Sequence, residues 1–259
     1  MKRETILRKI PTRKSADDEF PEDLLIKAAN LLEDEFESVF NRDLLTGRDL
    51  FEIVGGLDDY ICLNNFIASQ ITNKDFVIIF AGRLDQCKGI SYFITASKIV
   101  LDYVPNCHII IAGNGDYDTC MKERRNRWMN IHFTGFLEKA ELYELYSIAD
   151  FGVMPSLHEQ CSYTAIEMMM HALPIIASTS TGLSEMIVEG ITGLHVPVRD
   201  YEDKVDLDIS ILAEKMLYML NNENERNRMS KNARKRYLKF YSSKTMGEKM
   251  NNFYKKVLI

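Results

Sequence analysis

From residue 76 onward, short apolar segments alternate with longer segments of helical periodicity, and this alternation limits the possible folds more than any other feature. Short apolar runs are typical of buried strands, whereas apolar residues spaced by three and four predict amphipathic helices. The predicted strands are residues 76–81, 107–112, 130–134, 150–154, 173–177 and 193–196. The predicted helices are residues 89–103, 117–127, 138–148, 162–172, 182–188, 207–221, 224–240 and 243–257.

This alternation indicates an α/β fold, in which a Rossmann-like parallel sheet carries helices on both faces. Because crossovers between parallel strands are right-handed, the loops that follow the strands gather at one edge of the sheet. Open α/β sheets bind their ligands at that edge. We therefore expect the functional residues in the loops after the predicted strands.

Three regions are expected along the chain. Residues 1–58 form an N-terminal segment and linker, partly helical and partly disordered, residues 59–240 form the Rossmann-like domain, and residues 241–259 form a C-terminal helix. Within the first region, apolar residues at helical spacing predict an amphipathic helix over residues 21–40. Its apolar face packs on the chain's own core or, as the alternative, on a partner protein or a second copy.

Composition argues against several classes of protein. The net charge of −6 disfavours a nucleic-acid partner, and the apolar runs are too short to span a bilayer. Five cysteines without a C-x-x-C pair favour a reduced, cytoplasmic protein, and five histidines without metal-ligand spacing argue against a metal site. The basic face of residues 226–239 is interpreted as solvated, with weak membrane association as the alternative.

The loop after residues 150–154 combines two carboxylates with a helix start. Ser162 can cap the helix that follows, and helix N-termini favour anions, so a phosphate could sit near residues 162–164. Glu159 and Glu167 would repel that phosphate, so we expect them to accept hydrogen bonds from hydroxyl groups instead. A ligand with a phosphate and many hydroxyls is a nucleotide sugar.

The loop after residues 76–81 supplies two cations. Gly82 permits a tight turn, and Gly89 can begin the next helix close to the sheet. Arg83 offers a rigid fork for phosphate oxygens and Lys88 a compact charge, so the two could clamp a diphosphate. The alternative is a pair of solvated surface cations.

Three further loops are less specific. Gly113-Asn114-Gly115 is an incomplete dinucleotide fingerprint. The loop that ends at Leu137 could hold a base or be an ordinary turn. The hydroxyl-rich residues 178–185 could form a second phosphate cradle, a capping box, or both.

Together, these loops resemble the C-terminal, nucleotide-sugar-binding half of GT-B glycosyltransferases, in particular the retaining enzymes of glycosyltransferase family 4. The resemblance covers residues from about 76 to 258. Its motifs are Gly82-Arg83-Leu84 with Lys88-Gly89, Gly113-x-Gly115, Phe133-Thr134-Gly135, Ala149-Asp150, Pro155-Ser156, the pair Glu159 and Glu167, Leu173-Pro174-Ile175-Ile176-Ala177, and Gly190-x-Thr192-Gly193.

The resemblance implies a sugar transfer with retention from a UDP- or GDP-linked donor, and it implies no cofactor and no metal. The implied catalytic residues are Arg83 and Lys88, at the diphosphate, and Glu159, at the sugar hydroxyls. The other implied donor-binding residues are Gly113, Leu137 near the base, Ser162, Tyr163 and Thr164 near phosphate and sugar, and Glu167 at the ribose.

The sequence departs from the family pattern in two places and lacks one part of it. Thr181-Gly182 stands where the family often has Gly-Gly, and residues 160–163 stand where it often has Phe-Gly, so the donor sugar is expected to be distinctive. The roughly 75 residues before the first strand are too few for the acceptor domain of a GT-B enzyme. We expect an acceptor-domain protein or a second copy to pair through residues 21–40 and 243–257, where the family's last helix crosses onto the acceptor domain.

Two other functions compete with this one. The first is a truncated, catalytically inactive nucleotide-binding or interaction module. The second is another Rossmann-type enzyme such as a dehydrogenase, which the incomplete G-x-G and the two glutamates disfavour.

Overall fold

The computed structural model describes residues 71, 74–124, 127, 129–201 and 204–257. The helix predicted over residues 21–40, and the whole of the expected N-terminal region 1–58, lie outside the described residues. From residue 74 the structure confirms the predicted order of strands and helices, with boundaries that differ by a few residues.

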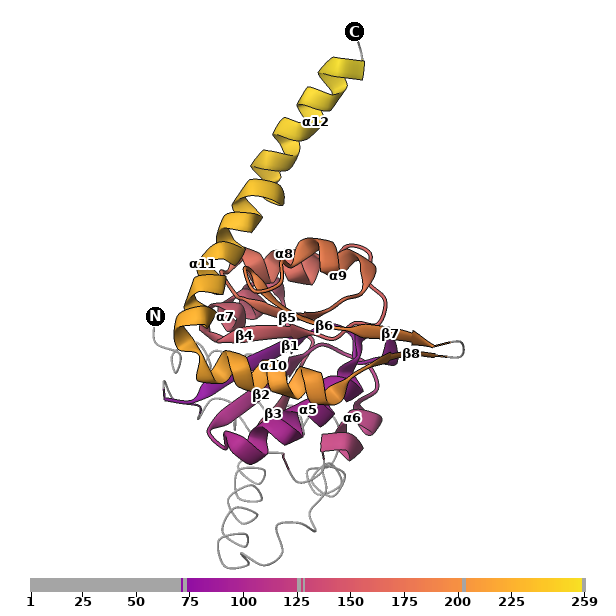
Figure 1. Cartoon of the computed structure of the whole chain (residues 1–259), viewed down its shortest axis with the longest axis vertical. Helices are drawn as coiled ribbons and strands as arrows, with labels where there is room; N and C mark the ends of the chain where they lie inside the picture. Colours follow the sequence, from indigo (N-terminus) through magenta and orange to yellow (C-terminus); the bar gives the residue numbers. More distant parts are fainter. Residues whose placement is uncertain (1–70, 72–73, 125–126, 128, 202–203, 258–259) are drawn as a thin grey trace, which may run out of the picture.

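A six-stranded parallel sheet forms the centre of the molecule, with the strand order β3-β2-β1-β4-β5-β6 (Figure 1). Chain order reverses between β1 and β4, so the loops that leave these two central strands diverge at a topological switch point. The strands are β1 (Phe76–Ala81), β2 (Cys107–Ala112), β3 (Ile131–Gly135), β4 (Phe151–Met154), β5 (Ile175–Ser178) and β6 (Gly193–Val196).

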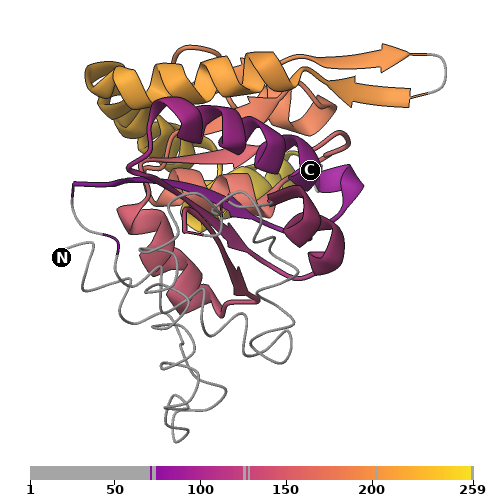
Figure 2. The same ribbon diagram turned by 90° about the horizontal axis from the view of Figure 1, so that it is seen from below.

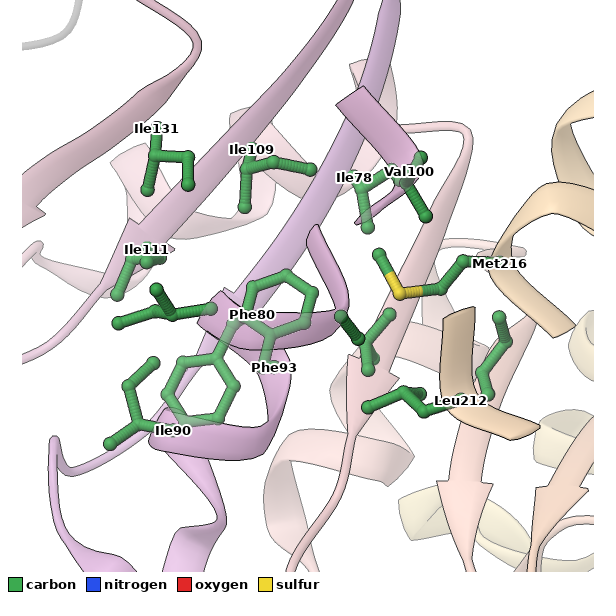
Figure 3. Packing of buried hydrophobic residues seen from close by; sticks show 14 of the residues in the cluster. Ile78, Phe80, Ile90, Phe93, Val100, Ile109, Ile111, Ile131, Leu212 and Met216 are labelled. Atoms are coloured by element: carbon green, nitrogen blue, oxygen red, sulfur yellow. The ribbon is translucent and has the colours of Figure 1, made fainter. Parts of the chain in front are cut away.

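Helices cover both faces of this sheet, as the strand and helix alternation predicts (Figures 1 and 2). One hydrophobic cluster joins the sheet to α5 (Ile90–Tyr103), α6 (Tyr117–Arg124) and α10 (Ile209–Asn221). Figure 3 shows Phe93 of α5 beside the strand residue Phe80, and Met216 of α10 near the strand residue Ile78. A second cluster joins the opposite face to α7 (Lys139–Ile148), α8 (Tyr163–Met170), α9 (Thr181–Met186) and α11 (Glu223–Phe240).

Two features extend beyond this three-layer body. An antiparallel hairpin of β7 (Val198–Tyr201) and β8 (Lys204–Leu207), which the sequence did not predict, projects from the side where β6 ends (Figures 1 and 2). The predicted helix 243–257 is confirmed as α12 (Ser243–Val257), which continues away from the sheet beyond α11 (Figure 1). Among the described helices, none combines the length and apolar content that a membrane span requires.

A buried arginine ties the C-terminal helices to the sheet. Arg226 donates hydrogen bonds to the carbonyls of Met219 and Leu220, at 2.6 and 3.2 Å. These carbonyls lie in the last turn of α10, where they have no amide partner within the helix. The Arg226 guanidinium also lies 3.7 Å from the carboxylate of Asp150, which accepts a 2.8 Å hydrogen bond from the Val77 amide. Asp150 therefore links β1, β4 and α11, and this role in the scaffold explains the Ala149-Asp150 motif.

Candidate functional site

The loops after β1 and β4 are packed against each other at the switch point. Gly89 has a left-handed φ of 72°, and a Cβ atom there would lie 2.1 Å from the carbonyl oxygen of Pro155. The amide of Leu157 donates to the carbonyl of Cys87 at 2.9 Å, across the same contact. Only glycine allows so close an approach, so the Lys88-Gly89 and Pro155-Ser156 motifs meet in space.

This contact brings Lys88 and Glu159 together. The Lys88 ammonium lies 2.6 Å from the Glu159 carboxylate, and the two side chains are 27% and 11% exposed. A short 3-10 turn, η1 (Gln86–Lys88), holds the lysine in place, because the Asp85 carboxylate accepts from the Lys88 amide at 2.9 Å. Two residues expected to act on one ligand are therefore neighbours, and each neutralises the other in this structure.

Arg83 occupies a more open position. Its side chain is 73% exposed, and its guanidinium lies 3.0 Å from the carboxylate of Asp85. Such an exposed ion pair contributes little to stability, so the guanidinium can leave it for a stronger anion at small cost. Arg83 is thus accessible to a ligand, whereas Lys88 is held in the wall of the site.

The start of α8 faces the same edge of the sheet. The Ser162 hydroxyl accepts from the Ala165 amide at 3.2 Å, which confirms the predicted N-cap. Tyr163 and Thr164 follow in the first turn, whose N–H groups have no carbonyl partner within a helix. Ser162 is buried and Tyr163 is exposed, so the Ser162 side chain serves the helix while the backbone of the turn remains available.

Glu167 lies one turn further into α8 and contacts α7. The Tyr143 hydroxyl donates to its carboxylate at 3.1 Å, and the Lys139 ammonium is 3.9 Å away. Burial, followed by the charge of Glu167, raises the pKa of Tyr143, so this phenol stays protonated and remains a donor. Tyr143 and Lys139 were not predicted as site residues, because sequence spacing does not show that α7 and α8 lie side by side here.

A cavity of about 310 Å³ opens between the ends of β1, β2 and β3 and the start of α8. Its size suits part of a small ligand, and its walls are mainly apolar. It brings together four of the predicted site residues, Arg83, Gly113, Leu137 and Thr164. The remaining lining residues are Ala81, Gly82, Ala112, Asn114, Phe136 and Leu142.

The glycines of the G-x-G segment are explained by packing between two loops. Gly113 has a φ of 139°, and a Cβ atom there would lie 1.9 Å from the carbonyl oxygen of Gly82. The amide of Leu84 then donates to the Asn114 carbonyl at 2.9 Å. These glycines let the β1 and β2 loops meet at the cavity floor, and this accounts for them without a dinucleotide fingerprint.

A second cavity, of about 320 Å³, lies on the other side of the Glu159 loop. Gly182, at the start of α9, packs directly against the Glu159 loop. Its amide donates to the Glu159 carbonyl at 2.7 Å, and a Cβ atom on Gly182 would lie 1.9 Å from the Gln160 carbonyl oxygen. The cavity is lined by Leu157, His158, Glu159, Gln160, Thr179, Ser180, Thr181, Val198 and Val205, so the hairpin forms one wall. Across the part of the chain described, no group of three or more metal-binding side chains is found.

Residues 64–236 match the family described as Glycosyl transferases group 1. An uncharacterised glycosyltransferase of Methanocaldococcus jannaschii is 33% identical over 129 residues, which are 49% of this chain and 33% of that protein. The alpha-D-kanosaminyltransferase of Streptomyces kanamyceticus is 25% identical over 70% of this chain and 46% of its own length. The chain thus spans between a third and about half of the length of these curated relatives.

Solved structures share the fold. The C-terminal domain of a group 1 family glycosyl transferase (LpcC) from Francisella tularensis has a TM-score of 0.56 at 21% identity, over 66% of this chain and 87% of that domain. The HepE protein of Anabaena, solved in complex with UDP and glucose, has a TM-score of 0.58 at 18% identity, over 70% and 48%. The described sheet and helices therefore have the Rossmann-like form found in GT-B glycosyltransferases. On the family match over residues 64–236, this chain belongs to the group 1 glycosyl transferases.

Proposed function

We propose that this chain is the donor-binding half of a retaining GT-B glycosyltransferase of family 4. It binds a UDP- or GDP-linked sugar, and the sugar passes to an acceptor held by a separate domain. The observation that carries the proposal is the meeting of the Lys88–Glu159 pair, the first turn of α8 and the 310 Å³ cavity at one switch point. Each supports binding of a different part of a nucleotide sugar.

The nucleoside fits the apolar cavity, with the base near Leu137 and the ribose hydroxyls donating to Glu167. The diphosphate then lies between Arg83, Lys88 and the amides of the first turn of α8, where the helix dipole also favours an anion. As the bond between sugar and diphosphate breaks, negative charge grows on the leaving phosphate. The two cations and the helix start stabilise that charge, and such preorganised electrostatics are a large part of catalysis.

The Lys88–Glu159 contact gives the binding step an internal order. In this structure the Lys88 ammonium and the Glu159 carboxylate lie 2.6 Å apart. An arriving diphosphate competes for the Lys88 ammonium, and the released Glu159 carboxylate becomes free to accept hydrogen bonds from the donor sugar. Diphosphate binding thereby makes the Glu159 carboxylate ready to bind the sugar.

The acceptor site is proposed to come from another domain or polypeptide. The chain covers 46% of the Streptomyces kanosaminyltransferase and 47% of the capsular polysaccharide glycosyltransferase CapM of Staphylococcus aureus. A solved GtfA/B complex, with a TM-score of 0.61 to this chain, is an assembly of two named proteins. These observations support a division of donor and acceptor sites, with capsule or other polysaccharide assembly as one setting.

Calorimetric titration of the purified chain with UDP, GDP, ADP and their sugar conjugates tests the proposal. We expect one nucleotide to bind saturably, and we expect Arg83→Ala and Glu167→Ala each to weaken that binding. Lys122→Ala is the matched control, because it removes an exposed cation from α6 that pairs with Asp118. If the folded chain binds none of these nucleotides, the alternative of an inactive interaction module replaces the proposal.

A further inference from the structure

The C-terminal helix α12 carries an apolar stripe on its surface. Met246, Met250, Phe253 and Tyr254 are each between 49% and 60% exposed. Their spacing of four, three and one residues places them on one side of the helix. Large apolar side chains gathered in this way are a sign of an interaction surface, whereas scattered ones are not.

The position of α12 makes this stripe energetically significant. The helix packs on the end of α11 and otherwise extends away from the sheet (Figure 1). An isolated helix of 15 residues is only marginally stable in water, and this one contains Gly247, which weakens it further. Burial of the stripe against a second apolar surface would stabilise the helix.

The charge of α12 restricts which partner can cover the stripe. The helix contains Lys244, Lys249, Lys255 and Lys256 against Glu248, which gives 4 − 1, or +3. Lys249 and Lys256 lie three or four residues from Phe253, so they border one edge of the stripe. A second α12 would set lysine against lysine, whereas an acidic amphipathic segment would pair both its apolar and its charged residues.

Residues 21–40 of this chain have the required chemistry. Their apolar residues recur at helical spacing, and they contain six acidic residues and one lysine, a net charge of −5. The acidic residues are Glu22, Asp23, Glu33, Asp34, Glu35 and Glu37. The 33 residues from 41 to 73 can span up to about 110 Å when extended, so chain length does not prevent contact with α12.

We propose that residues 21–40 pack as an amphipathic helix on the apolar stripe of α12 in the same polypeptide. The contact buries the stripe and sets the acidic residues of the segment against Lys249 and Lys256. It joins two distant parts of the sequence, and it goes beyond the proposed donor site because the stripe of α12 contains none of the residues proposed to bind the donor.

Hydrogen exchange of the full chain, followed by mass spectrometry, tests the contact. Phe253→Glu places a charge in the stripe, and Lys255→Glu places a glutamate on the opposite side of α12 as the matched control. We expect Phe253→Glu to accelerate exchange in residues 21–40 by about tenfold, and Lys255→Glu to leave it unchanged. Exchange in β1 to β4 should stay the same in both variants, which separates loss of the contact from loss of the fold.

A zero-length carbodiimide cross-linker gives the second readout, because it joins carboxylates to lysines in direct contact. In a mixture of isotope-labelled and unlabelled chains, we expect cross-links from residues 21–40 to Lys249 or Lys256 within one copy, and their loss in the double variant Lys249→Gln and Lys256→Gln. Equal exchange of residues 21–40 in the two glutamate variants would overturn the proposal. So would cross-links that join a labelled chain to an unlabelled one.

Discussion

The two members of the Lys88–Glu159 ion pair should have opposite effects on nucleotide binding when each is replaced. Lys88→Ala removes a cation from the diphosphate. Glu159→Gln keeps the shape of the side chain but removes the charge that competes with the diphosphate for Lys88, 2.6 Å away. If Lys88 binds the diphosphate, the first change weakens the binding of a nucleoside diphosphate and the second strengthens it.

The size of both effects follows from the geometry. A hydrogen bond between charged groups contributes about 1.5–3 kcal/mol, so Lys88→Ala should weaken binding by about 10- to 100-fold. Two unit charges about 5 Å apart interact by about 3 kcal/mol at an effective dielectric constant of about 20. Since Lys88 is 27% exposed and Glu159 is 11% exposed, water screens part of this repulsion. We expect about 1 kcal/mol from Glu159→Gln, or about fivefold tighter binding.

Calorimetric titration of the free nucleoside diphosphate, rather than the sugar conjugate, isolates this effect, because Glu159 has no sugar hydroxyls to accept from. The double variant should bind more tightly than Lys88→Ala alone, because the repulsion between the Glu159 carboxylate and the phosphate is lost there as well. Gln160→Glu serves as the control for charge in the same loop. Weaker binding by Glu159→Gln, or unchanged binding by Lys88→Ala, would show that Lys88 does not bind the diphosphate.

Three further predictions concern the scaffold around the site. Gly182→Ala should weaken nucleotide-sugar binding by about tenfold in the same titration, because its Cβ would meet the Gln160 carbonyl at 1.9 Å and displace the Glu159 loop; normal affinity would show that this loop does not form the site. Arg226→Ala should lower the free energy of unfolding by about 2–4 kcal/mol in urea titrations, because it removes the buried donor to the carbonyls at the end of α10 and the cation beside Asp150; a loss near zero would refute that role. Burial, the charge of His108 and the charge of Arg124 lower the pKa of His132 well below 6.5. As the pH falls below 6.5, His132 therefore takes up a proton in the unfolded chain but not in the folded one. The contribution of His132 to the free energy of unfolding is complete above pH 6.5, and below it falls by up to about 1.4 kcal/mol per pH unit. His132→Phe should reduce that slope in urea titrations at several pH values, and an unchanged slope would assign it to other groups.

The sequence predicts the body of the fold because its strands are apolar and uninterrupted. The burial of β1 and β4 between two helix layers leaves no polar side chain in them, so their limits are clear. The hairpin was missed for the opposite reason. Val198, Arg199 and Val205 stand among charged residues, and two four-residue strands that pair only with each other have no apolar run to reveal them.

The site is predictable where its parts are local in sequence. The Ser162 cap joins two residues only three positions apart, Ser162 and Ala165, and the structure confirms it. The Lys88–Glu159 contact joins residues 71 apart, and it depends on Gly89 fitting against Pro155, so only the folded chain shows it. The same holds for Tyr143, whose contact with Glu167 comes from the packing of α7 beside α8.

Hydrogen exchange with and without the nucleotide that binds shows whether the loops at the carboxyl edge of the sheet form a donor site. If they do, exchange should slow in residues 82–89, 113–116, 135–138 and 157–165, and stay unchanged in α6, α10 and the β7–β8 hairpin. Protection confined to the hairpin or to the C-terminal helices would contradict it, because the ligand would then lie away from Lys88, Glu159 and the start of α8.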